Sequence, residues 1–185
     1  MIHFVGAGPG AADLITMRGH QLLTEADVII YAGSLVNPEL LQYAKASCSI
    51  YNSASMTLEE VIDVMKQAEA KNQMTVRLHT GDPSLYGAIR EQMDQLDKDN
   101  ISYDVVPGVS SFCGAAAALK AEYTLPNVSQ SVIITRMAGK TPVPEKEEIA
   151  LLAAHQATMV IFLSTGMLEQ LSQRLLAGGY QTDPP

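Results

Sequence analysis

The chain alternates short, continuously apolar segments with longer stretches in which apolar residues recur every three or four positions. Continuous apolar runs are typical of strands buried on both faces of a parallel sheet, and the longer spacing is typical of amphipathic helices. The pattern predicts strands at Ile2–Gly6, Val28–Ala32, Ser49–Tyr51, Thr75–His79 and Tyr103–Val106. It predicts helices at Met17–Glu25, Pro38–Ala46, Leu58–Lys71, Leu85–Asp97 and Ser110–Leu119. This alternation predicts an α/β fold whose mainly parallel sheet is covered on both faces.

The pattern changes near Glu122, where Tyr123–Val128 carries turn residues and no helical period. We therefore predict an N-terminal α/β domain at residues 1–122 and a C-terminal α/β domain at residues 123–185. The second domain is predicted to contain strands Val132–Arg136 and Met159–Leu163, a helix from Glu145, and a helix Met167–Ala177 capped by Gly178-Gly179. Because two strands form a marginal sheet, we expect this domain to pack on its neighbour or to lack strands.

The loop after the first strand has the spacing of a dinucleotide-binding site without its other features. Gly6–Ala11 reads G-x-G-x-x-A. In a dinucleotide site the helix begins within the glycines and an acidic residue follows the second strand. Here Pro9-Gly10 keeps the loop irregular, Thr16 is the best helix N-cap, and the second strand ends in Gly33-Ser34. The loop is therefore predicted to bring backbone close to a ligand other than a pyrophosphate.

Composition narrows the class of protein. Of the 185 residues, 47% are hydrophobic and 17% are charged, as in ordinary soluble domains. No apolar run is long enough to span a membrane and no secretory signal precedes the first strand, so we expect a cytoplasmic protein without membrane contact. Cys48 and Cys113 lie in apolar surroundings and are predicted to be free, buried thiols.

Charge and histidine spacing exclude two further kinds of site. The formal net charge is −8 and the twelve basic residues are scattered, which argues against a nucleic-acid partner. The four histidines show no i,i+3 or i,i+4 pairing and the chain has no C-x-x-C. We expect no metal held by the protein's own side chains.

Three further loops follow predicted strands, at the sheet edge where open α/β folds bind ligands: Thr80–Gly87, Val106–Ser111 and Thr135–Lys140. Each has a simpler interpretation. Asp82-Pro83 can cap a helix that starts there, Ser110 or Ser111 can be an N-cap only, and Arg136 with Lys140 can belong to a solvated loop. A hydrolase is not indicated, because Phe112 stands where the G-x-S-x-G elbow needs its second glycine.

Taken together, the motifs resemble the tetrapyrrole methylases, the S-adenosylmethionine-dependent enzymes of corrin and siroheme synthesis. The resemblance is carried by Val5–Gly10, Asp13–Thr16, Ala26–Val28, Gly81–Pro83 and Pro107–Ser111. Within the family, further stretches resemble the subfamily that methylates C11 of precorrin-4 or cobalt-precorrin-4. These are Tyr31–Val36, His79–Ile89, Thr135-Arg136 and Thr141–Pro144.

The resemblance implies two α/β domains with a cofactor trough between them, a homodimer, and a tetrapyrrole substrate. It implies that S-adenosylmethionine contacts Pro9, Thr80, Gly81, Asp82, Leu85, Ser110, Ser111 and Leu163, leaving S-adenosylhomocysteine as product. Family members usually continue beyond the point where this chain ends. The C-terminal domain is therefore expected to be incomplete and the chain truncated.

Methyl transfer from a sulfonium to carbon is an in-line displacement that needs neither a metal nor a covalent enzyme intermediate. Asp82 can complement the positive charge of the sulfonium. The base that manages the substrate's proton is unknown, and the candidates are Asp82, Tyr86, His79 and Glu122.

The substrate carries carboxylates although the chain is acidic, so local cations are needed. The candidates are Arg136, Lys140 and Arg18. The alternatives are a methyltransferase for another corrin-pathway or siroheme-pathway tetrapyrrole, a nicotinamide-dependent oxidoreductase, and a non-catalytic cofactor-binding scaffold.

Overall fold

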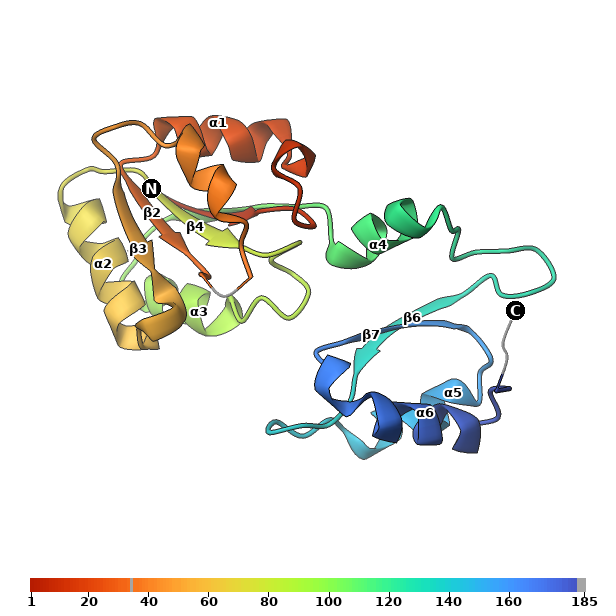
Figure 1. The fold of residues 1–185 in the computed structure, drawn as a ribbon. Coiled ribbons are helices and arrows are strands. Elements are labelled where there is room, and N and C mark those ends of the chain that lie inside the picture. Colours follow the sequence, from red (N-terminus) through yellow and green to blue (C-terminus); the bar gives the residue numbers. More distant parts are fainter. Residues whose placement is uncertain (34, 183–185) are drawn as a thin grey trace. The chain divides into compact units, whose positions relative to one another are not determined.

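The computed structural model describes residues 1–33 and 35–182, which form two compact units (Figure 1). The first unit is Met1–Ala118 and the second is Leu119–Pro185, so the division falls just before the boundary predicted after Glu122. Ser34, at the end of the predicted second strand, lies outside the described residues, as do residues 183–185.

A fully parallel sheet forms the centre of unit 1, as the apolar runs predict. Its strands pair in the order β3-β2-β4-β1-β5. From β1 the chain runs to β2 on one side of the sheet, and from β4 it runs to β5 on the other side. The topological switch point therefore lies between β1 and β4, where open α/β sheets bind ligands. The strands are β1 (Ile2–Gly6), β2 (Val28–Tyr31), β3 (Ser49–Asn52), β4 (Thr75–His79) and β5 (Tyr103–Val106).

Helices cover both faces of this sheet (Figure 1). One face packs against α1 (Met17–Glu25) and the 3₁₀ helix Pro38–Tyr43, and the other packs against α2 (Leu58–Ala70) and α3 (Arg90–Lys98). Neighbouring strand residues point to opposite faces, so Phe4 and Val5 enter different core clusters. α4 (Ser111–Leu119) follows β5.

Helix boundaries show what the pattern could and could not predict. Thr16 caps α1 as expected, its side chain accepting a hydrogen bond from the Gly19 amide at 3.1 Å. The helix predicted from Leu85 is wrong in its first turn, since α3 begins at Arg90. Tyr86 and Ala88 have φ values of 56° and 49°, which no right-handed helix contains. Asp82-Pro83 therefore caps no helix.

Up to residue 182, where its description ends, unit 2 contains two parallel strands, β6 (Val132–Arg136) and β7 (Thr158–Phe162). Its helices are α5 (Ile149–Ala153) and α6 (Leu168–Ala177), which contact each other. The helix predicted from Glu145 is a single 3₁₀ turn, Glu145–Glu147, followed by α5. The C-cap at Gly178 is confirmed, because the Tyr180 amide donates back to the Leu175 carbonyl at 3.1 Å. The remaining 3₁₀ turns of the described chain are Ala12–Leu14, Ser53–Ser55 and Thr165–Met167.

The cysteine prediction is only partly confirmed. Both thiols are free, but Cys113 is exposed on α4, which has no buried residue, and Cys48 is half-buried. Burial raises the pKa of the Cys48 thiol, so it stays protonated at neutral pH. In the described ranges, the helices are all too short or too polar to cross a bilayer.

Candidate functional site

The loops that follow β1 and β4 are joined backbone to backbone at the switch point. The Ala7 amide donates to the His79 carbonyl at 2.7 Å. Gly8 and Gly81 donate to each other's carbonyls, at 3.3 Å and 2.9 Å, and form an isolated antiparallel bridge. Two loops that are distant in the sequence are therefore held as one piece at the edge of the sheet.

The loop after β5 packs into the same piece through glycine. A Cβ added to Gly6 would lie 2.5 Å from the Cα of Gly108, and a Cβ added to Gly108 would lie 2.1 Å from the Gly81 carbonyl oxygen. Real Cβ atoms do not approach backbone this closely, so these glycines are required for the loops to meet. The first-strand glycine motif therefore shapes a junction of three loops.

Asp82 ties two of these loops with its side chain. Its carboxylate accepts hydrogen bonds from the Gly108 amide at 2.9 Å and from the amide and hydroxyl of Ser84. Partial burial alone raises the pKa of the Asp82 carboxyl, but the bonds from the Ser84 side chain and from the Gly108 and Ser84 amides outweigh it and lower the pKa. Asp82 is therefore ionised at neutral pH, and its carboxylate holds the second and third loops together.

The structure gathers most of the predicted cofactor residues around this junction. An added Cβ on Gly81 would lie 3.5 Å from the Cα of Ser110, and one on Gly114 in α4 would clash with Pro9. Ser110 is buried, Thr80 and Pro9 are half-buried, and Ser111 begins α4. Leu85 lies further along the second loop, and Leu163 belongs to unit 2.

Two predicted site residues have left-handed backbone without being glycine. Tyr86 has a φ of 56°, and Leu163, directly after β7, has a φ of 55° with 66% of its surface exposed. A large side chain held in this region stores local strain, which is common at functional sites. Sequence reasoning gave no sign of this, since neither residue type favours the conformation.

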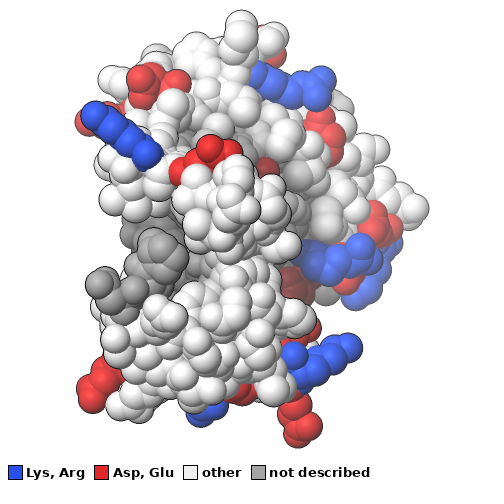
Figure 2. Space-filling model, turned by 90° about the vertical axis from the view of Figure 1, so that its right-hand side faces the viewer, with Lys and Arg blue, Asp and Glu red and all other residues white. Residues whose placement is uncertain are grey.

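The predicted cations are used differently. Arg136 donates to three carbonyls of its own loop, those of Met137, Thr141 and Pro142, at 3.2, 3.1 and 2.8 Å. Lys140 is exposed on that loop. On the face in Figure 2, basic side chains lie among acidic ones rather than in one block.

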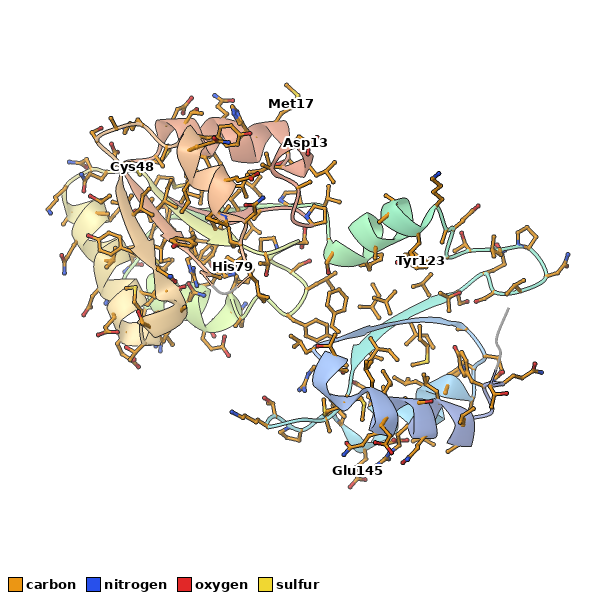
Figure 3. The ribbon with its side chains drawn as sticks, viewed as in Figure 1. Asp13, Met17, Cys48, His79, Tyr123 and Glu145 are labelled. Atoms are coloured by element: carbon orange, nitrogen blue, oxygen red, sulfur yellow. The ribbon has the colours of Figure 1, made fainter. Side chains whose placement is uncertain are left out.

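Arg18 is exposed near the start of α1 and has no ion pair within the described ranges. It lines a pocket of about 540 Å³ with Asp13, His20 and Tyr43. Met17, 91% exposed, projects beside Asp13 (Figure 3). This corner of unit 1 therefore offers a cation next to an exposed apolar side chain.

The four candidate bases differ in how exposed they are and in whether they are already hydrogen-bonded. His79 is 4% exposed, and burial together with the charge of Arg77 lowers the pKa of its imidazole to about 3. It stays neutral, because its side chain is buried although it is the last residue of β4. Asp82 is committed to its hydrogen bonds, and Glu122 is an exposed residue at the start of unit 2. Tyr86 is the exposed candidate on the second loop.

Comparison with known proteins identifies the family. The family model described as Tetrapyrrole (Corrin/Porphyrin) Methylases matches residues 1–185. The chain belongs to this family. Among residues 1–33 and 35–182, no group of His, Cys, Asp or Glu side chains is placed to hold a metal ion.

Individual tetrapyrrole methylases resemble the chain over almost its whole length. It is 57% identical to a cobalt-precorrin-4 C(11)-methyltransferase of Methanocaldococcus jannaschii, covering 98% of this chain and 70% of the relative. It is 45% identical to a precorrin-4 C(11)-methyltransferase of Mycobacterium tuberculosis, covering all of this chain and 74% of that protein. The X-ray structure of a cobalt precorrin-4 methyltransferase superposes with a TM-score of 0.95 at 43% identity, covering 98% of this chain and 76% of that one.

Proposed function

We propose that the protein transfers the methyl group of S-adenosylmethionine to C11 of precorrin-4 or cobalt-precorrin-4. The observation that carries the proposal is the 57% identity, over 98% of the chain, to an enzyme named for that reaction. The relatives are named for substrates with and without cobalt. A metal inside the tetrapyrrole belongs to the substrate and needs no ligand from the protein, so the proposal includes both forms.

The junction of loops in unit 1 has the chemistry that a methyl donor of this kind needs. Its glycines leave a surface made of backbone, and Thr80 and Ser110 add hydroxyl groups. S-adenosylmethionine would supply an activated methyl group on a sulfonium. We assign Pro9, Thr80, Gly81, Asp82, Leu85, Ser110 and Ser111 of unit 1, and Leu163 of unit 2, to holding it.

The residues act by positioning. Alignment of reacting groups is worth up to roughly 7–11 kcal/mol of the barrier. The ionised Asp82 carboxylate keeps the second and third loops in register and adds negative potential at the junction. We assign proton management to Tyr86, since it is exposed on the loop that carries Asp82.

Cations near the edge of each unit would bind the substrate's carboxylates. We propose Arg18 in unit 1 and Arg136 and Lys140 in unit 2 for this role. We further propose that the enzyme works as a homodimer in the cytoplasm, as the resemblance to the family implies.

Two measurements test the proposal. Calorimetry with S-adenosylhomocysteine should show saturable binding, whereas binding of NADH alone would indicate an oxidoreductase. Transfer of a labelled methyl group to precorrin-4, cobalt-precorrin-4 and an earlier tetrapyrrole should favour the precorrin-4 pair. Binding of the cofactor without transfer to any tetrapyrrole would indicate a scaffold and overturn the proposal.

A further inference from the structure

Arg77 is a buried cation without an acidic partner. It lies on β4 with 7% of its surface exposed. Its Nε donates to Gln92 Oε1 at 3.1 Å and one terminal nitrogen donates to the Ile30 carbonyl at 3.2 Å. Both acceptors are neutral, and no carboxylate of residues 1–33 or 35–182 forms an ion pair with it. Burying a charge without a counter-charge costs desolvation free energy, so a bound anion would stabilise this arrangement.

Arg77 also lines a pocket of about 370 Å³ between the start of α2 and the start of α3. One wall is apolar and consists of Met56, Leu58 and Val61. The volume lies in the range of about 300–1,000 Å³ that small-molecule sites occupy. The pocket therefore combines one buried cation with an apolar surface.

The other charged groups near the pocket are carboxylates, so Arg77 is the group that could bind an anion there. At the start of α2, the Glu60 carboxylate accepts from the Thr57 amide at 2.7 Å in a capping box, so this helix terminus already has its anion. The Glu59 carboxylate accepts hydrogen bonds from its own amide and from the Thr57 hydroxyl, which lower its pKa, so Glu59 is likewise ionised. Glu91 lines the pocket and is exposed.

We propose that this pocket binds a short-chain carboxylate, with its anionic end on Arg77 and its apolar stem against Met56, Leu58 and Val61. The carboxylate would complete the set of acceptors around the guanidinium. The apolar stem would displace water from the apolar wall of the pocket. This favours a carboxyethyl group over an inorganic anion, which has no apolar surface to bury.

The pocket is connected to the second loop of the junction. The Ala88 carbonyl accepts from Gln92 Nε2 at 3.0 Å, and Ala88 also lines the pocket. Ala88 lies near the end of the loop that follows β4, two residues before α3, so an occupant of the pocket would lie beside the far end of that loop. The carboxylate can come from a free acid or from a side arm of a tetrapyrrole, and only the second source rests on the proposed function.

Propionate is the probe, and thermal unfolding at constant ionic strength is the measurement. Replacing chloride by propionate should raise the unfolding midpoint saturably, whereas propionamide, the neutral analogue, should not. Gln92→Glu places a carboxylate beside Arg77 and should weaken the propionate effect about tenfold. Equal effects of propionate and propionamide, or an unchanged effect in Gln92→Glu, would overturn the proposal.

Gln92→Glu also removes the hydrogen-bond donor to the Ala88 carbonyl and could impair folding, so substitutions of exposed residues provide a second test. Glu91→Gln removes a like charge from the pocket wall and should strengthen propionate binding. Arg90→Gln is the matched control, since Arg90 is exposed and pairs with Asp94 at 2.6 Å outside the pocket lining. A propionate effect that responds to Arg90→Gln as strongly as to Glu91→Gln would show general screening and contradict the site.

Uroporphyrin, a tetrapyrrole with carboxymethyl and carboxyethyl arms, separates the two sources. If propionate competes with uroporphyrin in the unchanged protein but not in Gln92→Glu, the natural occupant is an arm of the macrocycle. If the two bind independently, the occupant is a free acid and the pocket stands without the proposed methyl transfer. If propionate fails to bind, the pocket assignment is wrong even where methyl transfer is observed.

Discussion

The sheet-edge loops of the two units are held by opposite means. In unit 1, three loops meet backbone to backbone, and the absence of side chains at Gly6 and Gly108 makes the contact possible. In unit 2, the loop after β6 is held by one long side chain, because the Arg136 guanidinium donates to three of its carbonyls. The loop junction of unit 1 is therefore sensitive to a Cβ added at Gly6 or Gly108, and the loop of unit 2 is sensitive to the loss of one charged group.

Adding a methyl group to unit 1 should produce the largest effect. In Gly108→Ala the new Cβ would lie only 2.1 Å from the Gly81 carbonyl oxygen, so the backbone of one of the two loops must move. We expect a loss of roughly 3 kcal/mol or more in the free energy of unfolding, at the upper end for overpacking. Chemical denaturation measures it, and calorimetry with S-adenosylhomocysteine should show lost binding.

The control for that substitution lies in unit 2. A Cβ on Gly166 meets nothing within 4 Å, so Gly166→Ala should leave stability and cofactor binding unchanged. Equal stability of the two variants would show that the three-loop contact is not tight, and the comparison between the units would fail.

Acid should affect unit 1 through His79. Burial, with a smaller contribution from Arg77, lowers the pKa of the folded imidazole to about 3, against about 6.5 in the unfolded chain. The unfolded chain therefore binds the extra proton first, and stability falls as pH drops from about 6.5 toward 3. In His79→Gln this part of the pH dependence should disappear. Unfolding midpoints measured from pH 7 to 4 would contradict the assignment if the two curves ran parallel.

Asp82 should show a smaller effect in a different pH window. Its folded pKa is lowered, so its contribution is present above the unfolded value near 3.9 and is lost as pH falls through the folded value. Asp82→Asn keeps the shape but loses charged acceptors, and we expect a loss of about 1–2 kcal/mol at pH 7. The difference from the unchanged protein should narrow below about pH 4. A difference that stayed constant down to pH 2 would mean that the charge of Asp82 does not join the loops.

The sequence predicted what depends on local pattern and missed what depends on contact. Apolar runs give the strands, and Thr16 gives the start of α1. The start of α3 was missed because the apolar spacing continues through Leu85 and Ile89, and nothing in Tyr86 or Ala88 announces a left-handed backbone.

The candidate site shows the same limit. The glycine motifs were found, but their role in packing on one another appears only when the ends of β1, β4 and β5 are adjacent. The three carbonyl acceptors of the Arg136 side chain were not predicted, because no periodic pattern in Met137–Pro142 indicates how that loop folds back on Arg136.

Substituting the charged residue that holds the loop of unit 2 should cost less stability than the substitutions in unit 1. Arg136→Lys keeps the charge, but one ammonium cannot span three carbonyls, so we expect a loss of about 1 kcal/mol. Hydrogen exchange of the backbone amides from Met137 to Thr141 should accelerate. Cofactor binding to unit 1 should not change. If the amides exchanged as slowly as in the unchanged protein, the hydrogen bonds of Arg136 would not hold this loop, and the contrast with unit 1 would be lost.

Lys140→Gln should leave stability unchanged and separates the two cations of that loop. Lys140 is exposed, so its charge is free to bind substrate, whereas the donors of Arg136 are largely occupied. Neutralising Lys140 should raise KM for the tetrapyrrole several-fold while kcat, S-adenosylhomocysteine affinity and the unfolding midpoint stay constant. The KM effect should shrink at high salt, because exposed charges are screened. An unchanged KM in Lys140→Gln would show that Lys140 does not contact the substrate, and only Arg136 would remain as the proposed substrate cation on this loop.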